Sequence, residues 1–315
     1  MIVPSAEAVP SMKRSVAACN VYISEHRAAA IAAVKKAILD SVAGRGASLA
    51  ASFTDAAYNR SSFSIAGEPS AVSRAAVAAC NAAIAFIDLR TAPPNVQHPR
   101  VGACDHIAFY PLQAVTLPEL AAYAQGAAAA ISDAHPTLPV MQYGTAHPAG
   151  LSLAAMRRST RYFSTHREDP EPTAALAGQG DLPIAGRLGP AQPCPAAGML
   201  TLGCVPFVLS FNVPLQTVDI AAGRTIASAV RERGGGATPR GAGLPCVEAL
   251  ALRGSCDKIE IATNLLDLSI TPAARVLERV CELAREAGIN VDSGAAYGIG
   301  LSQEELLRCG QEAHK

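Results

Sequence analysis

Three His-Pro dipeptides hold the histidines whose neighbours could support acid–base chemistry: His98-Pro99, His135-Pro136 and His147-Pro148. A proline restricts the residue before it to extended backbone, so each histidine is expected in a loop or at the end of an element. Only His98 is followed closely by both an arginine and a carboxylate, Arg100 and Asp105. An imidazole beside such groups can take up a proton near neutral pH, because its unperturbed pKa lies there.

Two interpretations of His98 stay open on these residues alone. It is either a general base or an ordinary loop histidine whose hydrogen bonds are satisfied by the fold. The small pair Gly102-Ala103 that follows allows another segment or a ligand to approach the backbone closely. By contrast, we expect His135 in a surface turn and His147 in a loop that leads into a helix.

Alternating strands and helices must position these residues. Strands are expected at residues 15–24, 47–54, 62–66, 107–114 and 139–143, and helices at residues 26–41, 69–87, 117–134 and 151–161. Proline and glycine then recur from Thr165 to Gly198, which favours a linker or loop. Further strands are expected at 206–214, 247–252 and 258–263, with helices at 218–233 and 272–287 and an amphipathic piece at 304–308. The pattern predicts two α/β blocks joined near residues 170–200.

The composition limits the classes of function. Of 315 residues, 50% are hydrophobic and 17% are charged. This balance allows a substantial core and excludes a disordered chain. The net charge is zero, so we expect no nucleic-acid or membrane partner, and local arginines must hold any anionic ligand. Nine scattered cysteines form no C-x-x-C pair, which predicts reduced thiols and no metal site. No apolar run reaches the ~18–20 residues of a membrane span.

The segment His98-Pro-Arg-Val-Gly-Ala-Cys-Asp105, with Ile87-Asp88-Leu-Arg90 upstream, resembles the region around the active-site histidine of formiminotransferases. Other blocks match that family in the same order, between about Ser15 and Asp292: Tyr58–Ser61, Ala66–Pro69, Tyr143-Gly144, Gly189-Pro190, Phe207–Val213 and Thr263–Asp267. The Cys19–Glu25 segment and the loop at His147 are more similar to stand-alone plant and algal members than to the animal enzyme.

This resemblance implies an α/β (α+β) fold of two α/β subdomains, at residues 13–170 and 171–300. Their mixed β-sheets would face each other across a folate cleft, with helices outside. It also implies transfer of a formimino or formyl group from a glutamate derivative to N5 of tetrahydrofolate, with His98 as general base. Tetrahydrofolate would be a co-substrate, without a metal. A homodimer in the cytoplasm or in a mitochondrial or chloroplast matrix is expected.

The resemblance also implies a set of binding residues. Arg60, Arg100 and Arg157 are candidates to hold glutamate carboxylates, because guanidinium groups bind carboxylates in a bidentate manner. The family's folate-contacting loop corresponds to Gly189, Pro190 and the following residues to Gly198. Asn212 and Asn264 would offer amide hydrogen bonds to the pterin, or serve as turn or cap residues. Asp55 and Asn59 belong to a turn that is about two residues shorter than in the animal enzyme, where an aspartate orients the site.

Two departures from the family pattern support an alternative. The folate loop, Pro193–Gly198, has lost aromatic and serine character, and Arg240 is nearly the only charge between Gly234 and Gly243. Each lost charge-assisted hydrogen bond to a folate tail would cost about 1.5–3 kcal/mol of binding free energy. The alternative is a catalytically weakened protein that acts as a structural or binding subunit of a larger assembly. A folate sensor that binds without turnover is a third hypothesis.

Overall fold

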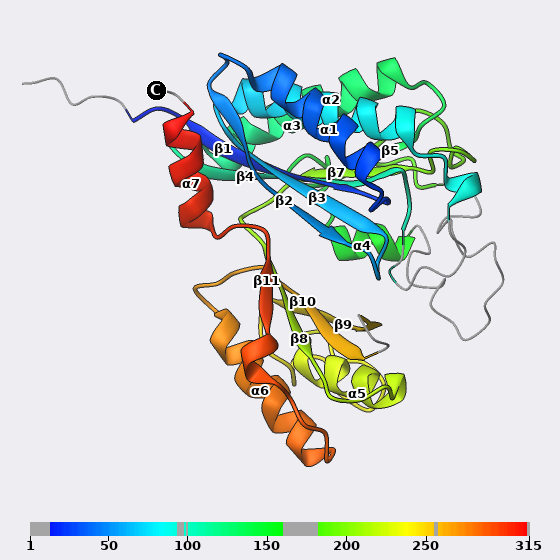
Figure 1. Cartoon of the computed structure of the whole chain (residues 1–315), viewed down its shortest axis with the longest axis vertical. Coiled ribbons are helices and arrows are strands. Elements are labelled where there is room, and N and C mark those ends of the chain that lie inside the picture. Colours follow the sequence, from blue (N-terminus) through cyan, green and yellow to red (C-terminus); the bar gives the residue numbers. More distant parts are fainter. Residues whose placement is uncertain (1–12, 93–97, 99, 160–181, 255–257, 314–315) are drawn as a thin grey trace, which may run out of the picture.

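The computed structural model of the protein describes residues 13–92, 98, 100–159, 182–254 and 258–313 (Figure 1). Its elements form two units, each built on one β-sheet with helices packed against it. The expected α+β class is therefore confirmed. No helix in the described ranges is long and apolar enough to cross a membrane.

The first unit is built on a seven-stranded mixed sheet with strand order β2-β3-β1-β4-β7-β5-β6. Strand β7 pairs in parallel with β4 and β5, and the other pairs are antiparallel. The strands are β1 (Val16–Ile23), β2 (Ala47–Asp55), β3 (Arg60–Gly67), β4 (Cys104–Gln113), β5 (Val140–Gly144), β6 (Arg187–Leu188) and β7 (Leu200–Cys204). Helices α1 (Ala28–Val42), α2 (Pro69–Phe86) and α3 (Leu117–Ala134) cover one face, above the sheet in Figure 1.

The second unit is built on a four-stranded sheet with strand order β11-β8-β10-β9. Its strands are β8 (Leu209–Pro214), β9 (Val247–Arg253), β10 (Ile259–Leu265) and β11 (Tyr297–Ile299), and α5 (Ile220–Val230) and α6 (Ala273–Glu286) cover one face. All pairs in this sheet are antiparallel, so the expectation of two mixed sheets is wrong for the second one. The short connection from β9 to β10 is one physical reason, because parallel neighbours need a long crossover.

Chain segments cross between the units in two places. The first crossing leads from the end of β7 at Cys204 to the start of β8 at Leu209. The second leads from β11 into α7 (Gln303–Glu312), which packs back on β1, β2 and β3 of the first sheet. Short helical pieces complete the fold: α4 (Leu153–Ser159), η1 (Leu89–Thr91) and η5 (Ser293–Ala295).

The Pro- and Gly-rich stretch from Thr165 to Gly198, which we expected to be a linker or loop, contains a strand of the first sheet. Residues 160–181, and with them the expected boundary at 170 and 171, lie outside the described residues. Beyond them the predicted linker contains β6 and leads directly into β7, and both belong to the first sheet. Strand β7 was not predicted, although it lies between β4 and β5 and all five of its residues are buried. By sheet membership, the change of unit occurs between Cys204 and Leu209.

The face of the first sheet opposite α1, α2 and α3 is partly polar. Odd-numbered residues of β1, from Ala17 to Ile23, pack under the helices, so the even-numbered ones point to the opposite face. Cross-strand partners share a face, which places the following buried or half-buried side chains together there: Asn20, Tyr22, Ser62, Ser64 and His106. Phe207 and Leu306 cover an apolar part of the same face. The polar part of this face contains side chains that could take part in acid–base chemistry.

Candidate active site

His98 lies in a cluster with Arg60, the first residue of β3, and Asp105 in β4. One guanidinium nitrogen, Nη2 of Arg60, donates to Oδ2 of Asp105 at 2.6 Å, and the other, Nη1, lies 3.3 Å from Nδ1 of His98. Arginine can only donate, so Nδ1 of His98 is the acceptor. In the neutral imidazole the proton is therefore on Nε2. The arginine thus fixes both the position and the tautomer of the histidine.

Asp105 is fully buried and anchors the cluster. Burial alone would raise the pKa of its carboxyl, but the charges of Arg60 and Arg157 and a hydrogen bond from the Val101 amide outweigh that effect, and the pKa is lowered. The Val101 amide nitrogen lies 2.6 Å from Oδ1. One ionised carboxylate therefore holds Arg60 from one side and the backbone just after His98 from the other.

Two tyrosine rings pack against His98 and Arg60. The Tyr58 ring packs against His98 with centroids 5.6 Å apart and planes at 60°. The Arg60 guanidinium carbon lies 5.2 Å from the centre of the Tyr22 ring, within the range of a cation–π contact. Tyr58 is 5% exposed, whereas His98 is half-buried. His98 is the more accessible member of the two.

A second histidine, His106, lies on the same face but is unsuited to accept a proton. Its Nδ1 donates to Thr201 Oγ1 at 3.0 Å, because that hydroxyl itself donates to the Asp105 carbonyl, and its Nε2 lies 3.2 Å from the Tyr143 hydroxyl. Burial, and then the charge of Arg157, hold the pKa of His106 well below its ordinary value. Both nitrogens are thus engaged, and the ring is neutral.

The segment that follows His98 is fixed by backbone pairing with the predicted folate loop. The Met199 amide donates to the Val101 carbonyl at 2.8 Å, and the Ala103 amide donates to the Ala197 carbonyl at 2.9 Å. Gly198 has φ +72°, and a Cβ there would lie 2.1 Å from the Val101 carbonyl oxygen; a Cβ on Gly102 would lie equally close to the Met199 carbonyl. Gly198 therefore permits the close approach that positions the His98 segment.

The other two residues predicted in that loop lie farther along the sheet. Gly189 has φ +77° and a Cβ there would be 2.8 Å from the Leu138 carbonyl oxygen, just before β5. Pro190 follows it, and the Leu182 amide donates to the next residue's carbonyl, that of Ala191, at 2.8 Å. The contacts of Gly189 are those of a tight structural turn. Pro99, within the His98 segment itself, lies outside the described residues.

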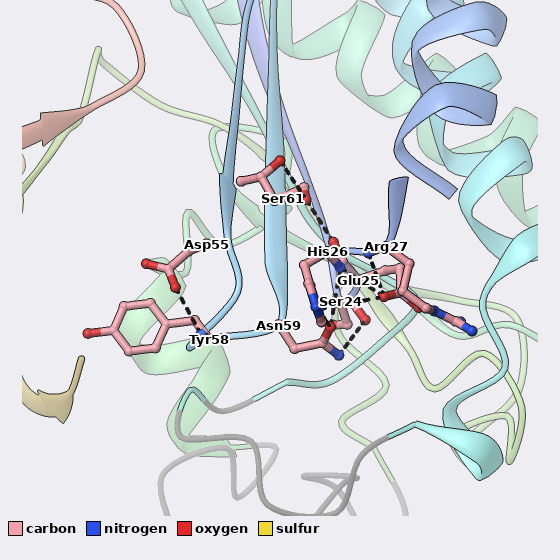
Figure 2. A network of polar contacts seen from close by, with 9 residues as sticks. Ser24, Glu25, His26, Arg27, Asp55, Tyr58, Asn59 and Ser61 are labelled. Carbon is pink, nitrogen blue, oxygen red and sulfur yellow. Dashed lines mark hydrogen bonds and ion pairs between the residues drawn. The ribbon is translucent and has the colours of Figure 1, made fainter. Parts of the chain in front are cut away.

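The turn between β2 and β3 is held by its own polar network, which Figure 2 shows. Asp55 Oδ1 accepts a hydrogen bond from the Tyr58 amide at 3.0 Å. Asn59 adopts φ 46° and its Oδ1 lies 2.5 Å from Nδ1 of His26. Asp55 therefore fixes the turn that carries Tyr58, and Asn59 ties the same turn to the end of β1. Both predicted residues serve the site through the backbone of this turn.

The same network contains a buried carboxylate, Glu25. It accepts from the backbone amides of His26 and Arg27, each at 2.9 Å, and from Nε of Arg27 at 2.7 Å. Burial alone would raise its pKa, but these hydrogen bonds and the charge of Arg27 outweigh burial and lower it. Its negative charge also acts on Arg100.

The three predicted arginines all act on Asp105. Arg60 contacts it directly, and the charge of Arg157, in α4, contributes to lowering its pKa. Arg100 is 6% exposed; burial lowers its pKa, and the charges of Asp105 and Glu25 oppose that effect. The structure therefore places all three cations where their charges act on Asp105, and their assignment to substrate carboxylates stays a prediction.

Asn212 and Asn264 lie in the second sheet, and neither is a turn or cap residue. Asn212 Nδ2 donates to Glu260 Oε2 and to the Tyr297 hydroxyl, each at 3.2 Å. Asn264 Oδ1 accepts from the Ser210 hydroxyl at 3.0 Å. Asn212 connects to the His98 cluster through Glu260, whose Oε2 also accepts from the Tyr58 hydroxyl at 2.9 Å.

Sequence reasoning missed the roles of Tyr58, His106 and Glu260. Tyr58 and its neighbours were noted only as a matching block. Glu260 does carry a recognisable signal, a carboxylate between Ile259 and Ile261 that is the only charged residue of its strand. Among the described residues there is no group of three or more His, Cys, Asp or Glu side chains that could hold a metal ion.

Comparison with known proteins bears on this arrangement directly. A family model described as the formiminotransferase domain, N-terminal subdomain, matches residues 16–205, which include every member of the His98 cluster. A formiminotransferase cyclodeaminase-like protein of Arabidopsis thaliana is 31% identical over 90% of this chain and 93% of its own length. The chain belongs to the formiminotransferase family. The resemblance inferred from the His98 segment is thereby confirmed.

Two other relatives match at 29% identity. The formimidoyltransferase-cyclodeaminase of Sus scrofa is 29% identical over 76% of this chain, and the match spans 42% of that protein. The glutamate formimidoyltransferase of Thermoplasma acidophilum is 29% identical over 80% of this chain and 77% of its own length. Membership of the family supports a folate-related formimino-transfer function.

Proposed function

We propose that this protein transfers a formimino or formyl group from a glutamate derivative to N5 of tetrahydrofolate, with His98 as the general base. The observation that carries the proposal is the contact of one guanidinium, that of Arg60, with both His98 and the buried carboxylate of Asp105. An ordinary loop histidine would not need a contact of this kind, which supports a catalytic role for His98.

N5 of tetrahydrofolate attacks the carbon of the formimino group, and a new N–C bond forms while the C–N bond to the glutamate nitrogen breaks. His98 takes up the proton that N5 loses and then gives it to the departing glutamate nitrogen, which leaves as the amine. Arg60, Arg100 and Arg157 provide positive charge for the carboxylates of both substrates.

The hydrogen bond from Arg60 sets a condition on this step. It occupies the Nδ1 lone pair of His98, which is the only lone pair of the neutral ring. Proton uptake at Nδ1 therefore requires the guanidinium to turn away. A substrate carboxylate is a group that can draw it, because arginine binds carboxylates more strongly than it binds neutral acceptors. Substrate binding would then make His98 basic at the moment when a base is needed.

The test is turnover of formiminoglutamate with tetrahydrofolate by the purified protein. General-base catalysis contributes about 10²–10⁴-fold to a rate, so His98→Ala should lower kcat by about that factor. His135→Ala is a matched control, because His135 also precedes a proline and its Nε2 lies 2.9 Å from Asn81, outside the cluster. Absence of turnover by the unsubstituted protein, or equal activity of the two variants, would contradict the proposal.

One observation favours a second candidate, a binding or structural subunit with weakened catalysis. Arg231 borders the glycine-rich loop 234–243, but its guanidinium donates to the carbonyls of Gly234 at 2.5 Å and Ala249 at 3.3 Å. Burial lowers its pKa to about 10, and the nearby Arg233 adds to the effect. The Arg231 guanidinium thus stabilises the glycine-rich loop 234–243 through these backbone hydrogen bonds. Calorimetric titration with tetrahydrofolate separates the cases, since micromolar binding contradicts a purely structural role.

A further inference from the structure

The two units are joined by covalent connections and apolar packing at one end of the second sheet. Strand β8 begins there at Leu209, and Ile299, at the end of β11, pairs with Ser210. Leu209 packs with Phe207 and with Leu306 of α7 against the face of the first sheet opposite α1, α2 and α3. This end, which we call the hinge end, would allow the second unit to rotate unless another contact held it.

A polar contact lies at the opposite end of the same sheet. Glu260 pairs with Pro214, five residues along β10 from Leu265, which pairs with Leu209 at the hinge end. Five residues of strand span about 16 Å. At that distance from the hinge, the Tyr58 hydroxyl of the first unit donates to Glu260 Oε2 at 2.9 Å. A hydrogen bond at this distance from the hinge end resists rotation of the second unit more effectively than one close to the hinge end.

Glu260 is well prepared to receive this hydrogen bond. It is 8% exposed, and the same oxygen, Oε2, accepts from the Tyr297 hydroxyl at 3.1 Å and from Asn212 Nδ2 at 3.2 Å. Both of these donors belong to the second unit. Burial, and then the charge of Glu260, raise the pKa of Tyr58 and raise that of Tyr297 to about 12. Both hydroxyls are therefore protonated donors at neutral pH.

Tyr58 is equally constrained on its own side. The Asp55 carboxylate holds its backbone amide at 3.0 Å, and the ring lies with its centre 5.6 Å from that of His98. Tyr58 is thus held through its backbone amide by the first unit and through its hydroxyl by the second. Between these two contacts, its ring packs against His98. The contact with His98 is between rings, so it transmits position and carries no proton.

We propose that Tyr58 and Glu260 form a clasp between the two units, and that Glu260 is a positioning residue that acts through the Tyr58 ring on His98. The kinetic consequence rests on the proposed function, whereas the clasp itself does not. When the hydroxyl bond is broken, the second unit rotates more freely about the hinge end, and the Tyr58 ring no longer restricts the imidazole.

The experiment compares single hydroxyl deletions in the full chain. Tyr58→Phe removes the bond between the units, and Tyr297→Phe removes a bond to the same oxygen within the second unit. Tyr123→Phe is the control, since Tyr123 is 40% exposed on α3, away from both units' contact. Small-angle X-ray scattering measures the radius of gyration, and NMR of ¹⁵N-labelled histidine, assigned with His98→Asn, measures the environment of His98.

We expect Tyr58→Phe to enlarge the radius of gyration, shift the His98 resonances and lower kcat about tenfold. Glu260→Ala, which removes the acceptor, should do the same, and Glu260→Gln should restore part of each effect. Tyr297→Phe and Tyr123→Phe should leave the radius of gyration and His98 unchanged. If Tyr58→Phe changes neither scattering nor resonances, or if Tyr297→Phe changes both as much, the clasp is refuted. If the unsubstituted protein shows no turnover, the proposed function fails, and the two physical measurements still decide the clasp.

Discussion

Breaking the ion pair of Arg60 and Asp105 should be among the most costly single changes in this protein. Asp105→Asn keeps the shape of the side chain but removes the charge that faces Arg60 Nη2 at 2.6 Å. Asp105 is fully buried and the Arg60 side chain is 13% exposed, so the remaining guanidinium has little water to replace its partner. Leaving one charge of a buried pair uncompensated costs about 3–5 kcal/mol. That is a large part of the roughly 5–15 kcal/mol that stabilises a typical domain.

The assay is a double-mutant cycle measured by denaturant unfolding at pH 7.5. Its members are Asp105→Asn, Arg60→Met and the variant that carries both substitutions. Each single variant removes the direct partner of a buried charge, whereas the double variant removes both charges of the pair, so it should be destabilised by less than the sum of the two, with a coupling of about 2 kcal/mol or more. Additivity within about 0.5 kcal/mol would refute the idea that these two charges stabilise each other. All three variants should lower turnover, because each disrupts the contacts through which Arg60 and Asp105 position His98.

Two further changes test the parts that surround this pair. The folded protein keeps His106 neutral below its ordinary pKa of 6.5, so the unfolded chain binds the proton first. The stability that this neutral ring contributes is therefore lost by about 1.4 kcal/mol per pH unit as the pH falls from the unfolded pKa toward the folded one. His106→Gln should lose less stability than the unsubstituted protein between pH 7 and pH 5, and equal losses would contradict the assignment. Gly198→Ala should destabilise the protein by about 1–3 kcal/mol more than Gly150→Ala, because of strain against the backbone. The two glycines have φ of +72° and +63°, but only Gly198 faces backbone, at 2.1 Å; equal unfolding midpoints for the two variants would contradict this.

The order of strands and helices was largely predictable because most elements have a clear local pattern. Helix α3 was predicted at residues 117–134, the range that the structure shows. Its start is locally encoded, because Thr116 and Glu119 form a capping box and Pro118 lies in the first turn. Strand β7 was not predictable in this way. It is a five-residue buried strand directly after a Pro- and Gly-rich stretch, and its identity depends on pairing with β4 and β5, which no local pattern records.

The site was predictable only as far as sequence neighbours reach. Arg60 and Asp105 meet because β3 and β4 both pair with β1, and Ile23 of β1 has Ser61 on one side and Cys104 on the other. The residues next to these partners are therefore brought to the same end of the sheet. The sequence around Arg60 or Asp105 does not by itself indicate this strand register. The bond between Tyr58 and Glu260 joins positions 202 residues apart, which places it still further beyond local reasoning.

The altered folate loop has a different meaning once its contacts are known. It holds the His98 segment through the backbone of residues 197–199 and through the absence of a side chain at Gly198. The loss of aromatic and serine side chains between Pro193 and Ala197 removes groups that could touch a ligand, but it leaves this backbone pairing intact. The position of His98 depends instead on Arg60, Asp105 and Tyr58, which lie outside the loop. Under the proposed function, a weakened folate loop would therefore lower ligand affinity and leave these contacts of His98 intact, so it argues against tight binding and not against catalysis.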